Sequence, residues 1–100
     1  MFKAGTRLES QVCGTQVIVI SAAESLSDLR CGGAGMVEVG GAKADGVNLD
    51  ERFADGVTMG KRYVDDAGAE VLVTKAGAGS LSVGEVPLHL KESKALPASD

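Results

Sequence analysis

Aromatic residues are scarce in this 100-residue sequence, which has no tryptophan and only Phe2, Phe53 and Tyr63. Its 10 lysine and arginine residues are outnumbered by 14 aspartate and glutamate residues. Proteins that bind nucleic acid need clustered basic side chains for the phosphates, and many also stack bases on aromatic rings. The sequence offers neither feature, so we do not expect nucleic-acid binding. The core has to be built from valine, leucine, isoleucine and methionine, which favours a thin β structure.

Long hydrophobic runs are missing as well. No run approaches the roughly 20 residues that a helix needs to span a bilayer. The first residues lack the hydrophobic segment of a signal peptide. We therefore expect a cytoplasmic protein that does not bind a membrane, folded as a single domain over residues 1–100, a usual length for one domain. In that compartment cysteines are more often free, buried or metal-bound than joined in disulfides.

Histidine occurs once, as His89 in the stretch PLHLKE. The alternation predicts a strand with Leu88 and Leu90 on one face and His89 on the other, toward solvent. General acid–base catalysis needs at least one further group beside a histidine, and no such pair is evident in the sequence. We therefore expect no catalytic residues, and we favour a protein that is not an enzyme.

The sequence contains a repeat, which indicates two units of similar structure. Residues 4–20 align with residues 59–74 when one residue is skipped, and residues 29–37 align with residues 81–89. The matched pairs include Gly5 with Gly60, Arg7 with Arg62, Gly14 with Gly68, Val17 with Val71, Val19 with Val73, Leu29 with Leu81, and Gly32 with Gly84. We predict unit one at residues 4–39, a connection at 40–58, unit two at 59–92 and a mobile tail at 93–100.

Both units are predicted to be β. The runs at residues 16–20 and 70–74 are rich in β-branched residues and are bounded by glycine or small residues. Residues 62–73 have the pattern of a hairpin that turns at Asp65–Gly68. Residues 73–83 have the pattern of a second hairpin, with Gly77 and Gly79 at its bend.

The connection is predicted to contain a short helical turn. Asn48 and Glu51 have the spacing of a capping box, and Gly56 is suited to end the turn. The predicted fold class is therefore all-β, with two small pseudo-repeated β units and a short helical turn between them. We expect each unit to form its own small sheet and the two sheets to pack through their valine, leucine and isoleucine faces.

Each of the two cysteines is followed by glycine, as Cys13-Gly14 and Cys31-Gly32. Glycine allows the positive φ of a tight cysteine knuckle, in which backbone N–H groups point at the sulfur. The stretch Ser10–Met36 resembles the desulforedoxin family, including the N-terminal domain of the desulfoferrodoxins. That zinc-ribbon-like fold pairs a C-x-x-C-G knuckle with a C-C-G-x-x-M knuckle. The resemblance implies that the two knuckles, and therefore the two sulfur atoms, lie side by side.

Two of the four iron ligands of that family are replaced in this sequence. Ser10 stands at the first cysteine position, and Gly32 stands at the second position of the adjacent pair. In unit two, Ala67 and Val83 stand at the positions of the two cysteines. A tetrathiolate iron site within one chain is therefore excluded.

Three interpretations of Cys13 and Cys31 remain open. They are small buried hydrophobic residues, or they are metal ligands of a single zinc or iron ion, or they form a disulfide or dithiol redox pair. In the metal interpretation, a second chain, Ser10, His89 or water would complete the ligand set. The other two interpretations need no cofactor.

Two hypotheses for function follow. The first is a small non-enzymatic accessory or protein-interaction module, such as a subunit of a larger bacterial-type complex. Short strands leave unpaired sheet edges, and these can bind a protein partner or a second copy in a homodimer. The alternative is a small metal-binding or redox protein whose chemistry resides in Cys13 and Cys31.

Overall fold

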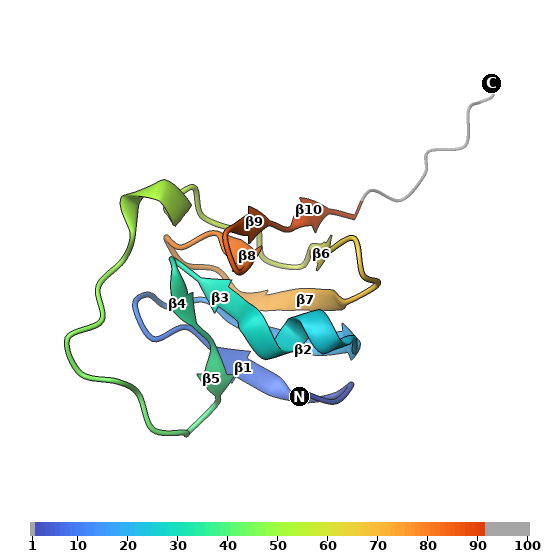
Figure 1. The fold of residues 1–100 in the computed structure, drawn as a ribbon, viewed down its shortest axis with the longest axis horizontal. Helices are drawn as coiled ribbons and strands as arrows, with labels where there is room; N and C mark the ends of the chain where they lie inside the picture. Colours follow the sequence, from blue (N-terminus) through green and yellow to red (C-terminus); the bar gives the residue numbers. More distant parts are fainter. Residues whose placement is uncertain (1, 92–100) are drawn as a thin grey trace.

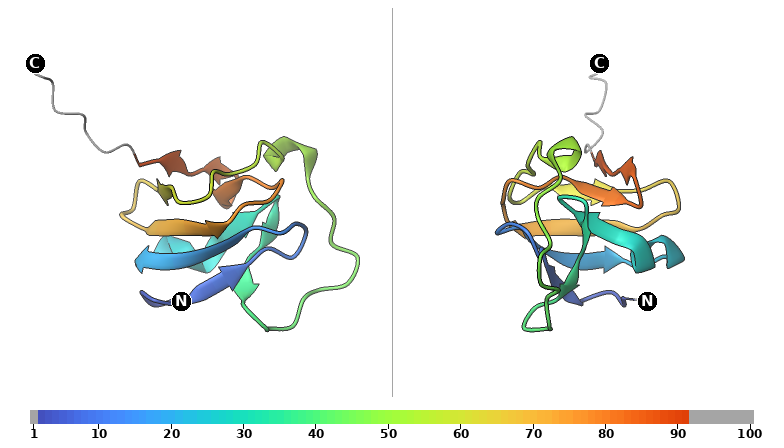
Figure 2. Two further views of the ribbon diagram at one scale, coloured as in Figure 1. Left: turned by 180° about the vertical axis from the view of Figure 1, so that it is seen from behind. Right: turned by 60° about the vertical axis from the view of Figure 1, so that its left-hand side comes forward.

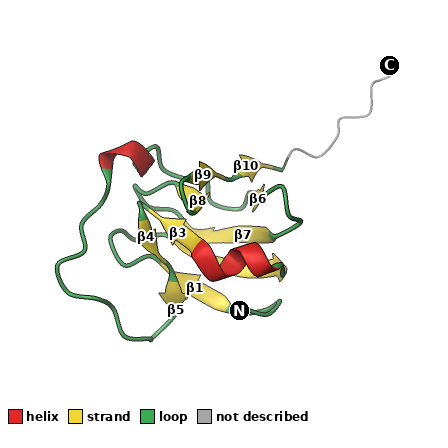
Figure 3. Ribbon diagram, in the orientation of Figure 1, coloured by secondary structure: helices red, strands yellow, loops and turns green. Residues whose placement is uncertain are grey.

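The computed structural model describes residues 2–91, so the predicted mobile tail at residues 93–100 lies outside the described residues. These residues form short strands and two 3₁₀ helices (Figures 1 and 3). The strands are β1 (Arg7–Glu9), β2 (Gln16–Ser21), β3 (Leu29–Cys31), β4 (Ala34–Gly35), β5 (Val37–Glu38), β6 (Arg62–Val64), β7 (Glu70–Lys75), β8 (Leu81–Val83), β9 (Val86–Pro87) and β10 (His89–Leu90). The helices are η1 (Glu24–Asp28) and η2 (Glu51–Phe53). The predicted all-β fold class is confirmed.

The five strands of unit one recur in unit two with the same order and the same lengths. Strand β1 pairs with β2 and β5, and β6 pairs with β7 and β10 in the same way. Glycines at matching positions also adopt the same left-handed backbone conformation, Gly5 with Gly60 and Gly32 with Gly84. The two units therefore share one fold, as the sequence repeat predicts.

Both sheets are shared between the units, which differs from the predicted arrangement of one sheet per unit. One sheet has the order β10-β6-β7-β2-β1-β5, and the other has the order β4-β3-β8-β9. The units meet along two antiparallel ladders, in which Ile18 lies opposite Leu72 and Arg30 lies opposite Ser82. These are equivalent positions of the two units, so an approximate twofold axis relates the units. The ladders pair strand edges that separate sheets would have left unpaired, and this explains the shared arrangement.

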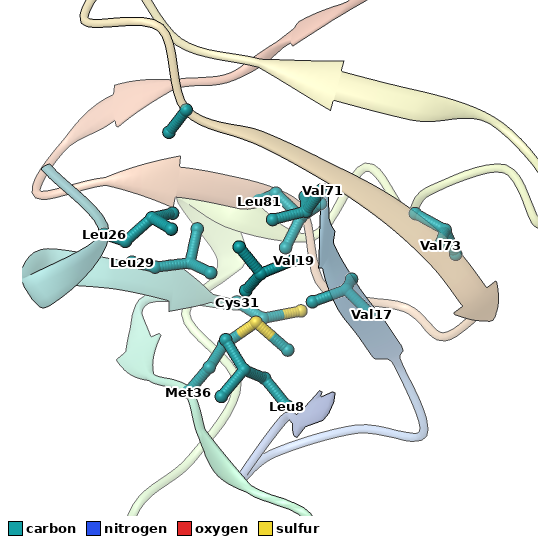
Figure 4. Close-up of a cluster of buried hydrophobic side chains, with 11 residues drawn as sticks. Leu8, Val17, Val19, Leu26, Leu29, Cys31, Met36, Val71, Val73 and Leu81 are labelled. Atoms are coloured by element: carbon teal, nitrogen blue, oxygen red, sulfur yellow. The ribbon is translucent and has the colours of Figure 1, made fainter. Parts of the chain in front are cut away.

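The hydrophobic core lies between the two sheets and contains side chains from both units (Figure 4). Alternate residues of β2 and β7 point into it, as the two-residue period of a strand requires. The most deeply buried apolar side chains are Leu8, Val17, Val19, Leu26, Leu29, Cys31, Ala69, Val71, Val73 and Leu81. The core is therefore aliphatic, in agreement with the scarcity of aromatic residues.

One of the two predicted hairpins is confirmed and the other is wrong. Strands β6 and β7 pair around a turn in which the Asp65 N–H donates to the Ala69 carbonyl oxygen, as predicted. Strands β7 and β8 do not pair, because they belong to different sheets. The segment with Gly77 and Gly79 crosses between the sheets and packs against unit one. A Cβ atom at Gly77 would lie 2.6 Å from the Thr15 nitrogen, so this glycine allows a close approach of two backbones.

The connection contains the predicted helical turn with different ends. Helix η2 begins after Asp50, whose carboxylate accepts the Arg52 N–H, so Asn48 is not its cap. It ends at Phe53 with Ala54 as its C-cap, before Gly56. The Asp50 N–H donates to the Gly32 carbonyl oxygen, which attaches the connection to unit one. Seen from behind in Figure 2, the preceding part of the connection forms a wide loop along one side of the sheets.

Helix η1 has no counterpart in the sequence analysis. It lies between β2 and β3 and buries Leu26 in the core. Its five residues carry no side-chain cap, so no start signal was available in the sequence. Among the described residues, neither helix has the length or the apolar character needed to cross a membrane.

Candidate functional site: a thiol pair between the two sheets

Cys13 and Cys31 lie next to each other, with 3.8 Å between their Sγ atoms. Cys13 lies in the turn between β1 and β2, whereas Cys31 is the last residue of β3 in the other sheet. Figure 4 shows Cys31 inside the hydrophobic cluster, where its side chain is fully buried. Cys13 is half-buried, and both thiols are free. The two cysteines thus differ in their access to solvent although their sulfur atoms are in contact.

The turn that carries Cys13 is closed by Ser10. The Ser10 N–H donates to the Thr15 carbonyl oxygen, and the Ser10 hydroxyl accepts the N–H groups of Val12 and Cys13. The hydroxyl oxygens of Ser10 and Thr15 each lie 3.3 Å from Cys13 Sγ. Both hydroxyl side chains are almost inaccessible to solvent. The sulfur of Cys13 is therefore held within a small buried cluster of polar groups.

Unit two contributes one group to this site. The Gly79 N–H donates to Cys13 Sγ over 3.3 Å. A Cβ atom at Gly79 would lie 2.8 Å from the Gly32 nitrogen and 3.0 Å from Cys31 Sγ. Only glycine therefore fits between the two sulfur-bearing segments. The sequence predicts a hairpin bend at Gly79 and gives no signal for Thr15, because no local pattern reports a contact between distant segments.

The surroundings of Cys13 favour its thiolate. Burial on its own would raise the pKa of this thiol. Hydrogen bonds from the Ser10 and Thr15 hydroxyls and from the backbone N–H groups of Thr15 and Gly79 outweigh burial and lower the pKa to about 7. Hydrogen bonds to the charged form of an acid lower its pKa in this way. A large fraction of Cys13 is therefore the nucleophilic thiolate at neutral pH.

Cys31 has the opposite character. Burial raises its pKa to about 12, and the nearby charge of Cys13 acts in the same direction, although hydrogen bonding to Thr15 opposes both. Cys31 is therefore a neutral thiol at physiological pH. The pair consists of one activated, partly accessible sulfur and one protonated, buried sulfur in contact with it.

The metal site of the desulforedoxin family does not fit these residues. The fourth ligand would project from position 32, where a Cβ atom would lie 2.6 Å from Leu49 Cδ1 and 2.7 Å from Val12 Cγ2. Apolar side chains thus fill the place of that ligand. The Ser10 oxygen already accepts two N–H groups. Within residues 2–91, no three side chains of histidine, cysteine, aspartate or glutamate are grouped to hold a metal ion.

The glycines that follow the two cysteines differ in backbone conformation. Gly32 has a φ of 66°, as expected for a knuckle. Gly14 does not adopt a positive φ, so the expected need for glycine after Cys13 is wrong. A Cβ atom at Gly14 would make only ordinary van der Waals contacts, so the backbone of this turn does not require glycine there.

His89 lies in unit two and does not contact the thiol pair. It is on β10, as the predicted strand requires, and its side chain is exposed. Its Nε2 atom lies 3.6 Å from the Asp66 carboxylate. The structure therefore does not bring His89 to the two sulfur atoms as a third ligand.

The two positions of unit two that correspond to Cys13 and Cys31 carry no sulfur. They are occupied by Ala67 and Val83, which line a hollow of about 180 Å³. The backbone around the two positions is alike: the Gly32 N–H donates to the Ser80 carbonyl oxygen, and the Gly84 N–H donates to the Asp28 carbonyl oxygen. The same scaffold is therefore present twice, once with two thiols and once with two apolar side chains.

Comparisons of the chain with models of protein families, with curated proteins and with solved structures give no match. The resemblance to the desulforedoxin family therefore depends on the residues of Ser10–Met36 alone. The thiol pair, with its contrast between Cys13 and Cys31, is the chemically distinctive feature of the described residues.

Proposed function

We propose that Cys13 and Cys31 form a thiol–disulfide redox pair, with Cys13 as the attacking thiolate and Cys31 as the resolving thiol. The observation that carries this proposal is the 3.8 Å contact between two sulfur atoms in opposite environments. A redox pair needs an accessible thiolate to react first and a second thiol within reach to complete the reaction. Cys13 and Cys31 meet these two requirements in that order.

The reaction begins with a disulfide-bonded substrate. The Cys13 thiolate attacks one sulfur of the substrate, a new S–S bond forms, and the other substrate sulfur leaves as a thiolate that takes a proton from water. Cys31 then gives its proton to water and attacks Cys13 Sγ. The Cys13–Cys31 disulfide forms, and the second substrate sulfur leaves as a thiolate that also takes a proton from water. The substrate disulfide gains two electrons and two protons. Counted from its dithiol form, the cysteine pair loses the same number, because Cys13 gave its proton to water when its thiolate formed.

Both steps agree with the environments of the two sulfur atoms. The Ser10 and Thr15 hydroxyls and the Gly79 N–H stabilise the Cys13 thiolate before the first step. The charge of Cys13 is one of the causes that raise the pKa of Cys31. This charge disappears when Cys13 enters the mixed disulfide, so Cys31 ionises more easily when it has to attack.

The test is equilibration of the full chain in mixtures of reduced and oxidised glutathione, followed by acid quenching and mass spectrometry. We expect an oxidised form that has lost two hydrogen atoms per chain and that returns to the starting mass with dithiothreitol. The Cys31→Ser variant should accumulate a mixed disulfide with glutathione, and the Cys13→Ser variant should react much more slowly. If the wild-type chain forms only mixed disulfides or disulfides between chains, the proposal is wrong.

We also propose that the chain binds another protein as an accessory module. The supporting observation is that, among residues 2–91, three of the five exposed large hydrophobic side chains, Met59, Val86 and Leu90, lie in unit two. Exposed apolar side chains that gather on one part of a surface mark protein-binding sites. Analytical ultracentrifugation of the purified chain separates binding to a second copy from binding to a different protein.

A further inference from the structure

The surface of unit one near the thiol pair is covered by the connection. The Leu49 side chain lies directly over Gly32, and the Asp50 N–H donates to the Gly32 carbonyl oxygen. The Ala44 N–H donates to the Gln11 side chain. Ala34 of β4 is only 7% exposed. An extended segment that places one half-buried leucine over Gly32 and donates backbone N–H groups therefore covers this part of unit one.

On unit two, Gly84 is the counterpart of Gly32, and a Cβ atom there would meet only Asp28 Oδ2, at 3.0 Å. The surface beside it is open among residues 2–91. Val86 of β9 is the counterpart of Ala34, and it is 62% exposed. Together with Ala67, Val83 and Pro87, it lines the hollow of about 180 Å³. The hollow is thus lined by these apolar side chains together with Asp65, Asp66 and His89, and it lies at the positions of unit two that correspond to the thiol pair and Ala34 of unit one.

We propose that this hollow is a docking site for an extended segment of a partner protein, which inserts a side chain of leucine size and places a lysine or arginine beside Asp66. The inference rests on the accessory function proposed above and is independent of the redox proposal. The partner segment would cover unit two as the segment around Leu49 covers unit one. The approximate twofold axis makes the two surfaces comparable, because their backbones follow the same course.

The size and lining of the hollow favour a peptide segment. Sites for small molecules usually have volumes of about 300–1,000 Å³, so this hollow is too small for most of them. Pro87 has no N–H group, which weakens any pairing of an added strand along β9. Insertion of a side chain, as seen for Leu49 on unit one, is therefore the favoured mode of binding.

The charges at the rim favour a basic partner. The Asp65 carboxylate accepts the N–H groups of Ala67 and Ala69. These bonds oppose the effect of burial, and the net result is a lowered pKa, so Asp65 stays charged at neutral pH. The Asp66 side chain is 88% exposed and has its nearest basic group, His89, at 3.6 Å. The exposed Glu85 lies next in sequence to Val86, and the whole chain has a net charge of −4.

The probe for this site is a peptide with the sequence of residues 43–51 in which Asp45, Asp50 and Glu51 are replaced by lysine. It is titrated into the full chain labelled with ¹⁵N, and amide shifts are followed by NMR. We expect saturable shifts at residues 65–68 and 83–87. A second peptide with serine in place of Leu49 should bind at least about tenfold more weakly, because it lacks the one buried leucine side chain.

Two exposed positions supply the variants of the chain. Val86→Ser should weaken binding of the lysine-bearing peptide by about tenfold. Asp66→Lys should weaken it at low salt, with a smaller effect at high salt, because the charges are exposed. Val39→Ser, which changes an exposed valine of unit one, is the matched control and should leave the affinity unchanged.

The outcomes separate this inference from the accessory function. Saturable shifts confined to another surface overturn the docking site and leave protein binding intact, whereas no binding at all overturns both. A chain that ends at Lys91 identifies one competing occupant: altered amide shifts around the hollow in that chain would mean that residues 92–100 fill it, and the inference would be wrong. If the chain forms a dimer and Val86→Ser dissociates it, the hollow binds a second copy of the chain, and the inference would again be wrong.

Discussion

The two units carry equivalent turns that differ in chemistry. In unit one, Ser10 caps the turn and Thr15 closes it, with Cys13 between them. In unit two, Asp65 caps the turn and Ala69 closes it, and the sequence between them is one residue shorter. Both turns lead into a strand of the same length. The comparison shows that the fold does not need thiols or a buried threonine hydroxyl at this position.

Burying the polar cluster of unit one therefore has a desolvation cost in folding free energy that the equivalent position of unit two does not have. Burying a hydroxyl or a thiolate requires hydrogen-bonding partners to offset desolvation. Ser10 and Thr15 of unit one and the Gly79 N–H of unit two supply these partners, whereas unit two places alanine and valine at its own two equivalent positions. An arrangement that the scaffold does not require, and that lowers the pKa of one cysteine, is best explained by a chemical role.

Making unit one resemble unit two should have the largest effect on chemistry. The double substitution Cys13→Ala with Cys31→Val copies the side chains of Ala67 and Val83. We expect complete loss of oxidation by glutathione, with the far-UV circular dichroism spectrum unchanged, because unit two shows that the scaffold tolerates these side chains. If the doubly substituted chain is unfolded, the thiols are structural and the comparison is misleading.

The converse change tests whether the scaffold alone brings two sulfur atoms together. Ala67→Cys with Val83→Cys, introduced into the chain without Cys13 and Cys31, should form a disulfide on oxidation and stabilise the chain by about 3 kcal/mol through loop closure. The new thiols should react slowly at pH 7, because Asp65 places a negative charge beside them where Ser10 places a hydroxyl. Urea unfolding and alkylation rates measure the two effects. Failure to form the disulfide would show that the two units place these positions differently.

Gly79→Ala should disturb the contact between the units. The added Cβ atom would lie 2.8 Å from the Gly32 nitrogen and 3.0 Å from Cys31 Sγ. We expect a loss of about 2 kcal/mol in the free energy of unfolding, as for other overpacked sites, and a higher pKa of Cys13. Gly35→Ala is the matched control, because a Cβ atom at Gly35 meets no atom within 4 Å. Equal effects of the two substitutions in urea unfolding would contradict this account.

Features of this structure that depend on neighbouring residues can be predicted from the sequence, whereas contacts between distant segments cannot. The β-branched runs and the turn residues are local signals, so the repeat and the first hairpin could be predicted. The approach of Cys13 to Cys31 was implied by the resemblance to the desulforedoxin family. The pairing of Ile18 in β2 with Leu72 in β7 and the contact of Gly79 with Cys13 join residues more than 50 positions apart. Such contacts depend on how the two units pack, and a short glycine-rich segment such as that around Gly79 is equally typical of a tight turn.

Ser10→Ala should have a smaller effect on stability than Gly79→Ala. It leaves the N–H groups of Val12 and Cys13 without their acceptor, which costs about 1.5 kcal/mol for partly buried groups. It also removes one of the hydrogen bonds that lower the pKa of Cys13. Thermal unfolding and the pH dependence of alkylation measure the two effects, and Ser27→Ala on the exposed side of η1 is the control. An unchanged pKa of Cys13 would show that the Ser10 hydroxyl does not stabilise the Cys13 thiolate.

The pH dependence of stability should show the smallest effect. The pKa of Cys13 is lowered to about 7 in the folded chain, whereas a thiol in the unfolded chain has a pKa of about 8.5. The folded state therefore loses its proton first, and its stability should rise between pH 7 and pH 8.5 and be lost again as the pH falls through 7. Because Cys13 is only half-buried, solvent screening limits the gain to about 1 kcal/mol. Urea unfolding at several pH values should show this rise in stability in the wild-type chain and not in Cys13→Ser. A rise of equal size in both chains would mean that a group other than Cys13 causes the pH dependence.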